Sequence, residues 1–597
     1  ILVCCFFYKQ PFLLLTQQQI NYEQSSEPGR RQFLTEADDI RDVLTNETGT
    51  ESVIGISFDI SNVGEVFVSK GAFQGMCNLR FLRIINKDSL SGGEGTLELP
   101  EGIEFLSSSL RLLDWGGCPI KSLPPRFQPA HLVELRMPES KLEKLWGGTQ
   151  PLPNLKIIDL NRSRRLKEIP NLSNATNLER LILEGCKSLV ELPSSIKNLQ
   201  KLKELNVQWC SMLQVIPNNI NLASLKRLDM SYCSRLSTFP DISKNIKTLN
   251  LGDTEIEDVP PSFAEYFSRL EHLNICSISL KRLTHVPLCI TSLVLSGSHI
   301  QRIPYCVIDL TRLSWLAVEN CRKLKSIPDL PPSLDTLDAK DCVSLKRVRF
   351  SFHNPTERLD FSHCLKLDEE SIRRIIQKSI YDVVCLPGKK IPAEFTHKAT
   401  GRSITIPLAP GSLSASSRFK ACLLFLPVAN YNYGDISCSI RSTGGVTAHN
   451  LKWHTPLFFK SQHLVICHGN LFRQRSKCQE VDVTLSEVDM TMSEITFEFN
   501  HKYKGDKIIE CGVQIMTEEA EVSCSRELDS FETEGSSSEM DDYETESISS
   551  SEDEYDRAEF SWSLMRPNQF LYLLSFFTIF IGYYLVKKDR DGDCTAL

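Results

Sequence analysis

A sequence motif that returns at a short, regular period constrains the fold of this 597-residue chain more than any other feature. Between about residues 155 and 345 the pattern L-x-x-L-x-L-x-x-C/N/T, then Leu, then I/L-P, recurs every 20 to 24 residues. Four consecutive copies begin at Asn154, Asn177, Lys201 and Ser224. One copy cannot cover its own apolar side chains, so the period predicts a stack of similar units around a common core.

Each copy contains the pattern of a short strand. Leu202, Leu205 and Val207 place apolar side chains on one side of such a strand. Stacked copies align their strands as a parallel sheet, and this period and consensus are typical of leucine-rich repeats. We therefore expect an α/β leucine-rich-repeat solenoid over residues 62–368, with about a dozen repeats.

The residues between the leucines are expected to point outward and to form a wall that binds another protein. Aromatic side chains with charged neighbours are frequent contact hot spots. In the alternative interpretation, Trp209 and Tyr232, each preceding a repeat cysteine, only cap the edge of the solenoid. The candidate protein-binding residues are Lys203, Glu204, Asn206, Gln208, Trp209, Lys226, Arg227, Asp229, Tyr232 and Trp315.

Composition argues against several other functions. The net charge of −8 argues against phosphate-driven binding of nucleic acid. This argument is weakened because much of the acidity is concentrated between Glu518 and Asp556 and the remainder of the chain is close to neutral. The sequence contains no nucleophile constellation, phosphate loop or metal-ligand spacing, and we predict no catalytic residue, cofactor or metal. The 21 cysteines show no C-x-x-C pair. Several of them share one repeat phase, which predicts buried free thiols and a reducing compartment: Cys186, Cys210, Cys233, Cys321 and Cys342.

The first 28 residues are left unassigned. Residues 1–15 are apolar but interrupted by Lys9, Gln10 and Pro11, which is too short for a spanning helix and lacks the basic start of a signal peptide. Because the chain begins at Ile1 rather than at Met, we expect either a fragment of a longer product or an erroneous gene model.

The stretch from Gly29 to Ser61, GRRQFLTEADDIRDVLTNETGTESVIGISFDIS, predicts a helix over Leu34–Leu44 and a strand over Val53–Phe58. It resembles the tail of the nucleotide-binding module in plant intracellular immune receptors of the Toll/interleukin-receptor, nucleotide-binding, leucine-rich-repeat type. The resemblance continues through AFQGMCNLRFLRI, through LDW ending at Trp115 and through KLEKLW ending at Trp146.

After a predicted helix over Glu369–Ser379, the periodicity changes to short alternating apolar runs, which predict an all-β sandwich over residues 383–517. This region resembles the jelly-roll or immunoglobulin-like domain (C-JID) that follows the repeats in the same receptors. Glu394 stands where that family usually has Trp. The matching pattern comprises Leu386, Pro387, Gly388, Ile391, Pro392, Phe395, His397, Gly401 and Ser403.

Two C-terminal segments complete the predicted organisation. Residues 518–560 are acidic and Ser-rich, with too few apolar side chains to form a core, and are predicted to be a disordered linker. Residues 569–587 contain the uncharged run FLYLLSFFTIFIGYYLV, which predicts a transmembrane helix acting as a tail anchor.

The resemblance implies the sensing half of an immune receptor, with the repeats in the cytoplasm. Its partners would be a pathogen effector or a guarded host protein, together with other receptor chains. The family's NAD-cleaving activity resides in a Toll/interleukin-receptor domain that this sequence lacks, so no enzyme is predicted. The alternative is a plasma-membrane receptor-like protein with extracellular repeats, to which sequons at Asn46, Asn161, Asn171 and Asn174 would be available.

Overall fold

The computed structural model describes the repeat region and the domain that follows it. The chain divides into two compact units between Ser525 and Arg526, and every described residue belongs to the first unit. The predicted acidic linker and transmembrane helix, and residues 1–25, lie outside the described residues. Within the described part, no helix combines the length and the apolar character needed to cross a bilayer. The described residues are 26–61, 63–85, 95–100, 102–218, 220–281, 283, 285–349, 358–378, 383–409, 413, 417–426, 432–442, 449–457, 461–471, 493–501 and 508–516.

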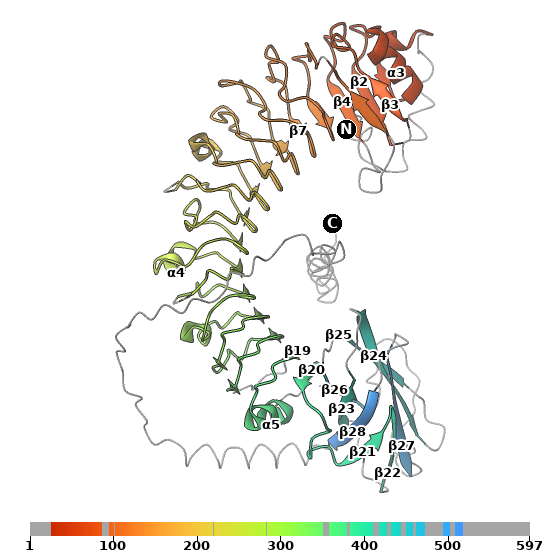
Figure 1. Ribbon diagram of the computed structural model, residues 1–597, viewed down its shortest axis with the longest axis vertical. Coiled ribbons are helices and arrows are strands. Elements are labelled where there is room, and N and C mark those ends of the chain that lie inside the picture. Colours follow the sequence, from red (N-terminus) through yellow and green to blue (C-terminus); the bar gives the residue numbers. More distant parts are fainter. Residues whose placement is uncertain are drawn as a thin grey trace, which may run out of the picture. The chain divides into compact units, whose positions relative to one another are not determined.

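The repeats build one parallel sheet, with one short strand from each copy, along one side of the stack (Figure 1). Equivalent residues lie opposite each other, so that Leu205 pairs with Leu181 on one side and with Leu228 on the other. The predicted solenoid is confirmed. Its strands are β4 (Phe81–Ile85), β6 (Leu112–Trp115), β7 (Glu134–Arg136), β8 (Ile157–Asp159), β9 (Arg180–Ile182), β10 (Glu204–Asn206), β11 (Arg227–Asp229), β12 (Thr248–Asn250), β13 (His272–Asn274), β14 (Ser292–Val294), β15 (Trp315–Ala317), β17 (Thr336–Asp338) and β19 (Arg358–Asp360).

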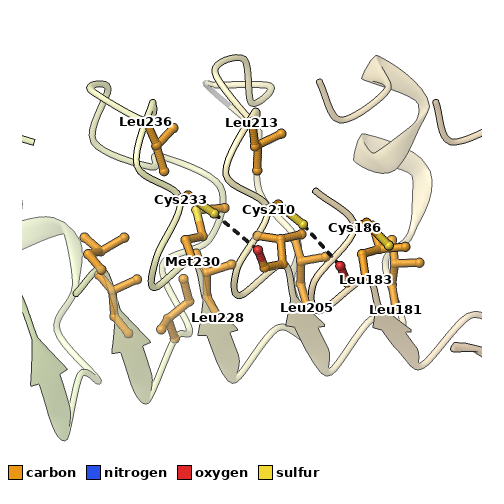
Figure 2. Close-up of a cluster of buried hydrophobic side chains, with 14 of the residues drawn as sticks. Leu181, Leu183, Cys186, Leu205, Cys210, Leu213, Leu228, Met230, Cys233 and Leu236 are labelled. Atoms are coloured by element: carbon orange, nitrogen blue, oxygen red, sulfur yellow. Dashed lines mark hydrogen bonds between the residues drawn. The ribbon is translucent and has the colours of Figure 1, made fainter. Parts of the chain in front are cut away.

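The repeat cysteines connect successive copies inside the core (Figure 2). The Cys210 thiol donates a hydrogen bond to the Leu183 carbonyl at 3.1 Å, and the Cys233 thiol donates one to the Val207 carbonyl at 3.2 Å. Burial raises the pKa of the Cys186 thiol to about 12. All sixteen cysteines in the described part of the chain are free, and the prediction of buried free thiols is confirmed for the repeat positions.

The parallel sheet begins before the first predicted repeat. Strand β2 (Gly55–Asp59) pairs with β4 and with β1 (Phe33–Leu34). The helix predicted over Leu34–Leu44 instead spans Ala37–Asn46 (α3). It starts later because Leu34 belongs to strand β1 and pairs with Ile56 of β2. The remaining elements here are η2 (Pro28–Arg30), β3 (Glu65–Phe67) and β5 (Thr96–Glu98).

Turns and short helices form the side of the stack away from the sheet (Figure 1). Asparagine side chains tie these turns together, since Asn154 Nδ2 donates to the Ala130 carbonyl at 3.0 Å and Asn177 Nδ2 to the Pro153 carbonyl at 2.6 Å. The short elements outside the main sheet are η3 (Ser194–Asn198), α4 (Phe263–Tyr266), η4 (Tyr305–Val307), β16 (Ser326–Ile327) and β18 (Arg347–Val348).

The region after the repeats consists of helix α5 (Glu369–Lys378) and two groups of strands. The first group continues the repeat sheet, because β20 pairs in parallel with β19 and antiparallel with β26. The second is a separate antiparallel sheet, and both contribute to one core in which the rings of Phe419 and Phe497 lie 4.9 Å apart. The strands are β20 (Val383–Pro387), β21 (His397–Thr400), β23 (Arg418–Phe425), β26 (His463–Asn470) and β28 (Ile508–Met516) in the first group, and β22 (Ser403–Pro407), β24 (Asn432–Ser442), β25 (His449–Leu457) and β27 (Glu494–His501) in the second.

Candidate protein-binding wall

Apart from Trp315, the predicted binding residues lie on the outward side of strands β10 and β11, just before these strands, or in the turns that follow them. The strand period of two produces this face. Leu205 and Leu228 are buried, whereas the neighbouring Glu204 and Arg227 reach solvent. We call these outward positions the candidate wall; its members are Lys203, Glu204, Asn206, Gln208, Trp209, Lys226, Arg227, Asp229 and Tyr232.

Ion pairs between repeats order the charged part of the candidate wall. Glu204 Oε2 lies 2.7 Å from Arg180 Nε and 3.0 Å from Arg227 Nη2, so one carboxylate bridges three strands. Lys203 Nζ lies 2.6 Å from Glu179 Oε2. The hydrogen bond from Lys203 lowers the pKa of Glu179, which keeps that carboxylate ionised. Because these pairs are exposed, each contributes little to folding, and their charges stay accessible to a partner.

The polar residues at the ends of the two strands are held by local hydrogen bonds. Asn206 Oδ1 accepts the backbone N–H of Gln208 at 2.9 Å. Asp229 Oδ1 accepts both the backbone N–H and the hydroxyl of Ser231, at 3.0 and 2.6 Å. Burial raises the pKa of Asp229, while the hydrogen bonds from Ser231 and Asn250 act to lower it. Asn206 and Asp229 therefore shape the turns after the strands.

Trp209 and Tyr232 stack face to face at the edge of the candidate wall. Their ring centroids are 3.7 Å apart and their planes differ by 2°. Both have left-handed backbone conformations, with φ of 62° and 60°, where the chain turns after the strand. The backbone N–H of Trp209 donates a hydrogen bond to the Ser231 carbonyl at 2.9 Å, which fixes the two turns against each other. Both rings are half-buried, so the stack caps the repeat edge and also presents an aromatic surface.

Trp315 is separate from the other predicted residues. It is half-buried in β15, between Ser292 and Thr336 on the adjacent strands. Three strands separate β15 from β11, which corresponds to roughly 19 Å at the usual strand spacing. Trp315 and the Trp209–Tyr232 stack are therefore two distinct aromatic positions on one sheet.

The post-repeat motif mainly supports the fold. Phe395 is fully buried, and a Cβ on Gly388 would lie 2.5 Å from a methyl carbon of Leu464. Gly401 has φ of 87°, which a glycine adopts without strain. The other motif residues belong to the same packing and pairing: Leu386, Pro387 and Ile391 are buried, Pro392 and His397 are half-buried, and Ser403 is exposed at the start of β22.

A group of buried polar residues at the end of the repeat sheet was not predicted from the sequence. His463 Nε2, from β26, accepts the backbone N–H of His363 at 2.8 Å, and His363 Nδ1 lies 2.9 Å from Asp341 Oδ1. Asp360 pairs with Arg358 at 2.9 Å. The repeat phase of Arg358 and Asp360 was visible in the sequence, but no local pattern marks His463, which lies 100 residues beyond His363.

The described residues include no group of three or more His, Cys, Asp or Glu side chains arranged to hold a metal ion. Burial raises the pKa of the repeat thiols, so these cysteines are poor nucleophiles. The arrangement of exposed charges and rings on a rigid sheet is suited to binding a macromolecular surface.

Comparison with known proteins finds one family-model match in the repeat region and one in the region after the repeats. A family model described as Leucine Rich Repeat matches residues 131–150, and one described as C-JID domain matches residues 386–552. The first match lies in the repeat that contains β7, and the second begins within β20.

Several proteins of Arabidopsis thaliana are similar over most of this chain. Disease resistance protein RML1B is 49% identical over 66% of this chain and 38% of its own length. Disease resistance protein RML1A is 41% identical, covering 70% and 41%. Disease resistance protein RPS6 is 35% identical, covering 65% and 42%. The chain thus spans about two fifths of the length of the curated relatives it matches.

Proposed function

We propose that this chain, which belongs to the plant disease-resistance proteins of the Toll/interleukin-receptor, nucleotide-binding, leucine-rich-repeat type with a C-JID domain, acts as the sensing part of an innate-immune receptor. Its partner would be a pathogen effector or a host protein that an effector alters. The observation that carries this proposal is the candidate wall, where exposed charges and stacked rings stand on a sheet whose other face is fully packed.

The domain after the repeats is proposed to take part in the same recognition. We treat its two sheets as a β-sandwich, which is supported by their shared core. Because β20 extends the repeat sheet through β19, this domain is covalently and structurally continuous with the wall. A single partner would contact both if it spanned the seven strand spacings from β11 to β20, roughly 34 Å along the sheet.

The proposed location of the wall is the cytoplasm, with attachment to a membrane through residues 569–587. Sixteen free cysteines among the described residues support the reducing side of the membrane, because extracellular domains commonly oxidise theirs. Glycosidase treatment of the expressed protein tests this point. A shift in mass after treatment would place the sequons, and hence the repeats, outside the cytoplasm.

Direct binding tests the sensing function. The purified chain is assayed against a panel of secreted pathogen proteins by biolayer interferometry, alongside a Trp209→Ala/Tyr232→Ala variant. We expect at least one pathogen protein to bind the wild type, and the variant to bind it at least tenfold more weakly, because stacked aromatic anchors dominate such interfaces.

The matched control is Tyr305→Ala, at a side chain 73% exposed on the turn side of the stack. This variant should bind like the wild type. Equal loss of binding in both variants, or unchanged binding in the Trp209→Ala/Tyr232→Ala variant, would contradict recognition through the wall.

A further inference from the structure

The residues immediately before the strands form a hydrogen-bonded ladder that includes Lys203 and Lys226 of the candidate wall. The backbone N–H of Lys203 donates to the Glu179 carbonyl, and Lys226 and Lys247 each donate to the equivalent residue one repeat earlier, at 3.0 and 2.8 Å. The backbone N–H of Glu271 in turn donates to the Lys247 carbonyl at 2.9 Å. These bonds fix the spacing of the side chains along the column, so their charges form a regular array at the edge of the sheet.

Three consecutive positions of this ladder are lysines, and glutamates bound the run at both ends. Lys203 pairs with Glu179, and Lys247 pairs with Glu271, each at 2.6 Å. The central Lys226 is exposed, and its ammonium group has no carboxylate partner among the residues that the structure describes. The column therefore carries a local excess of positive charge centred on Lys226.

Arg227 extends this charge onto the face of the sheet. Its side chain is 64% exposed, and it shares the Glu204 carboxylate with Arg180. One carboxylate thus faces two guanidinium groups, which leaves part of their charge uncompensated. We call Lys203, Lys226, Arg227 and Lys247 the basic cluster.

We propose that the basic cluster is a docking site for a short acidic segment of a partner protein. This inference rests on the proposed function and specifies the chemistry of the partner. Lys203 and Lys226 immediately precede β10 and β11, and Trp209 and Tyr232 follow the same two strands, so the stack lies at the opposite ends of these strands from the two lysines. A segment lying across these strands would place carboxylates on the cluster and an apolar side chain against the rings.

The boundaries of the cluster favour an acidic peptide over nucleic acid. The three lysines cover two strand spacings, roughly 10 Å, before Glu179 and Glu271 reverse the charge. A nucleic acid chain gains affinity by neutralising many phosphates along its length, and these two carboxylates would repel its continuation. Two or three carboxylates on a short peptide match the available charge.

The test uses the full chain and a fluorescein-labelled short poly-glutamate peptide, with affinity measured by fluorescence anisotropy at low and high salt. The test variant is Lys226→Glu/Arg227→Glu. The matched control is Lys187→Glu/Lys197→Glu, which makes the same change of charge at two exposed lysines, one of them in η3 on the turn side. Thermal melting by circular dichroism establishes that all three proteins are folded.

We expect salt-sensitive binding to the wild type and the control, and at least tenfold weaker binding to the test variant. Equal affinity in all three folded proteins would overturn the proposal, as would tighter binding of an oligothymidine of matched charge than of poly-glutamate. If the test variant unfolds, Lys226→Gln/Arg227→Gln replaces it under the same criterion. A pathogen protein that binds through the aromatic stack but is indifferent to the basic cluster would sink this inference while leaving the sensing function intact.

Discussion

At the scale of single residues, burial controls the charge of several groups where the repeats meet the following domain. His463 is fully buried, with Nδ1 2.8 Å from the Ser461 carbonyl and Nε2 accepting the His363 N–H. This pattern requires the neutral ring, with its proton on Nδ1. Protonation of Nε2 would place two N–H groups against each other in a site closed to water.

The first prediction concerns the pH dependence of stability. Burial, with the nearby His363, lowers the pKa of His463 to about 4 from 6.5, although Asp360 and Asp341 oppose the shift. Between these values the unfolded chain binds the proton and the folded chain does not, so stability falls as the pH drops from 6.5 towards 4. We expect this group alone to lower the free energy of unfolding by roughly 2 kcal/mol between pH 6.5 and 5.

Urea unfolding at pH 7 and pH 5 measures this effect. His463→Gln keeps an acceptor for the His363 N–H but cannot take up a proton, so its unfolding free energy should change less with pH than that of the wild type. Identical pH dependence in the two proteins would show that His463 does not control this loss.

The second prediction concerns Asp338, which is half-buried near Asp360 and Glu319. Burial, followed by the charges of these two acids, raises the pKa of Asp338 to about 7. The folded carboxyl group holds its proton where the unfolded one has lost it, so this group reduces stability as the pH rises from about 4 to 7. Asp338→Asn should therefore stabilise the protein at pH 8, by on the order of 1–2 kcal/mol, and have less effect at pH 4.

Differential scanning fluorimetry at both pH values tests the second prediction. Asp309→Asn, at an exposed carboxylate one repeat earlier, is the control and should leave the melting temperature almost unchanged. A melting temperature that falls at pH 8 in Asp338→Asn would mean that the ionised carboxylate is stabilising.

At the scale of elements, each repeat contributes a strand because its alternating leucines are buried only when they pack against the leucines of the neighbouring repeats. This local rule explains why the strands were predictable from the sequence: Leu205 and Leu228 lie on adjacent strands in the expected register. The start of α3 was not predictable, because a pairing between Leu34 and Ile56 decides it. The contact of His463 with His363 was likewise invisible, since it joins positions 100 residues apart.

The third prediction separates the inward and outward residues of one repeat. Leu205→Ala should lower the free energy of unfolding by about 2–4 kcal/mol, because it leaves a cavity in a packed interior. Lys203→Ala, two residues earlier, should change it by less than about 1 kcal/mol, because its ion pair with Glu179 is exposed.

Chemical denaturation of the two variants under one set of conditions gives both values. The paired design controls for the repeat and for truncation to alanine. Comparable destabilisation by both changes would be incompatible with an outward-facing Lys203.

At the scale of the whole molecule, two regions that the sequence distinguished share one sheet. The change of periodicity near Val383 predicted a new domain, and the structure has antiparallel strands there. The parallel pairing of β19 with β20 across this boundary could not be predicted, because neither strand carries a pattern specific to its neighbour. The candidate wall could be predicted in its composition, whereas the stacking of Trp209 on Tyr232 required the left-handed turns of the structure.

The central question about this continuous sheet is whether partners bind the outward face of its strands. Site-specific photo-crosslinking answers it most directly. The photoreactive amino acid benzoylphenylalanine is placed at Trp209 in one protein and at Tyr305 in another, and each is irradiated with a pathogen protein found to bind the wild type. We expect a crosslink from position 209 and none from position 305, whereas a crosslink from position 305 alone would contradict binding at the outward face.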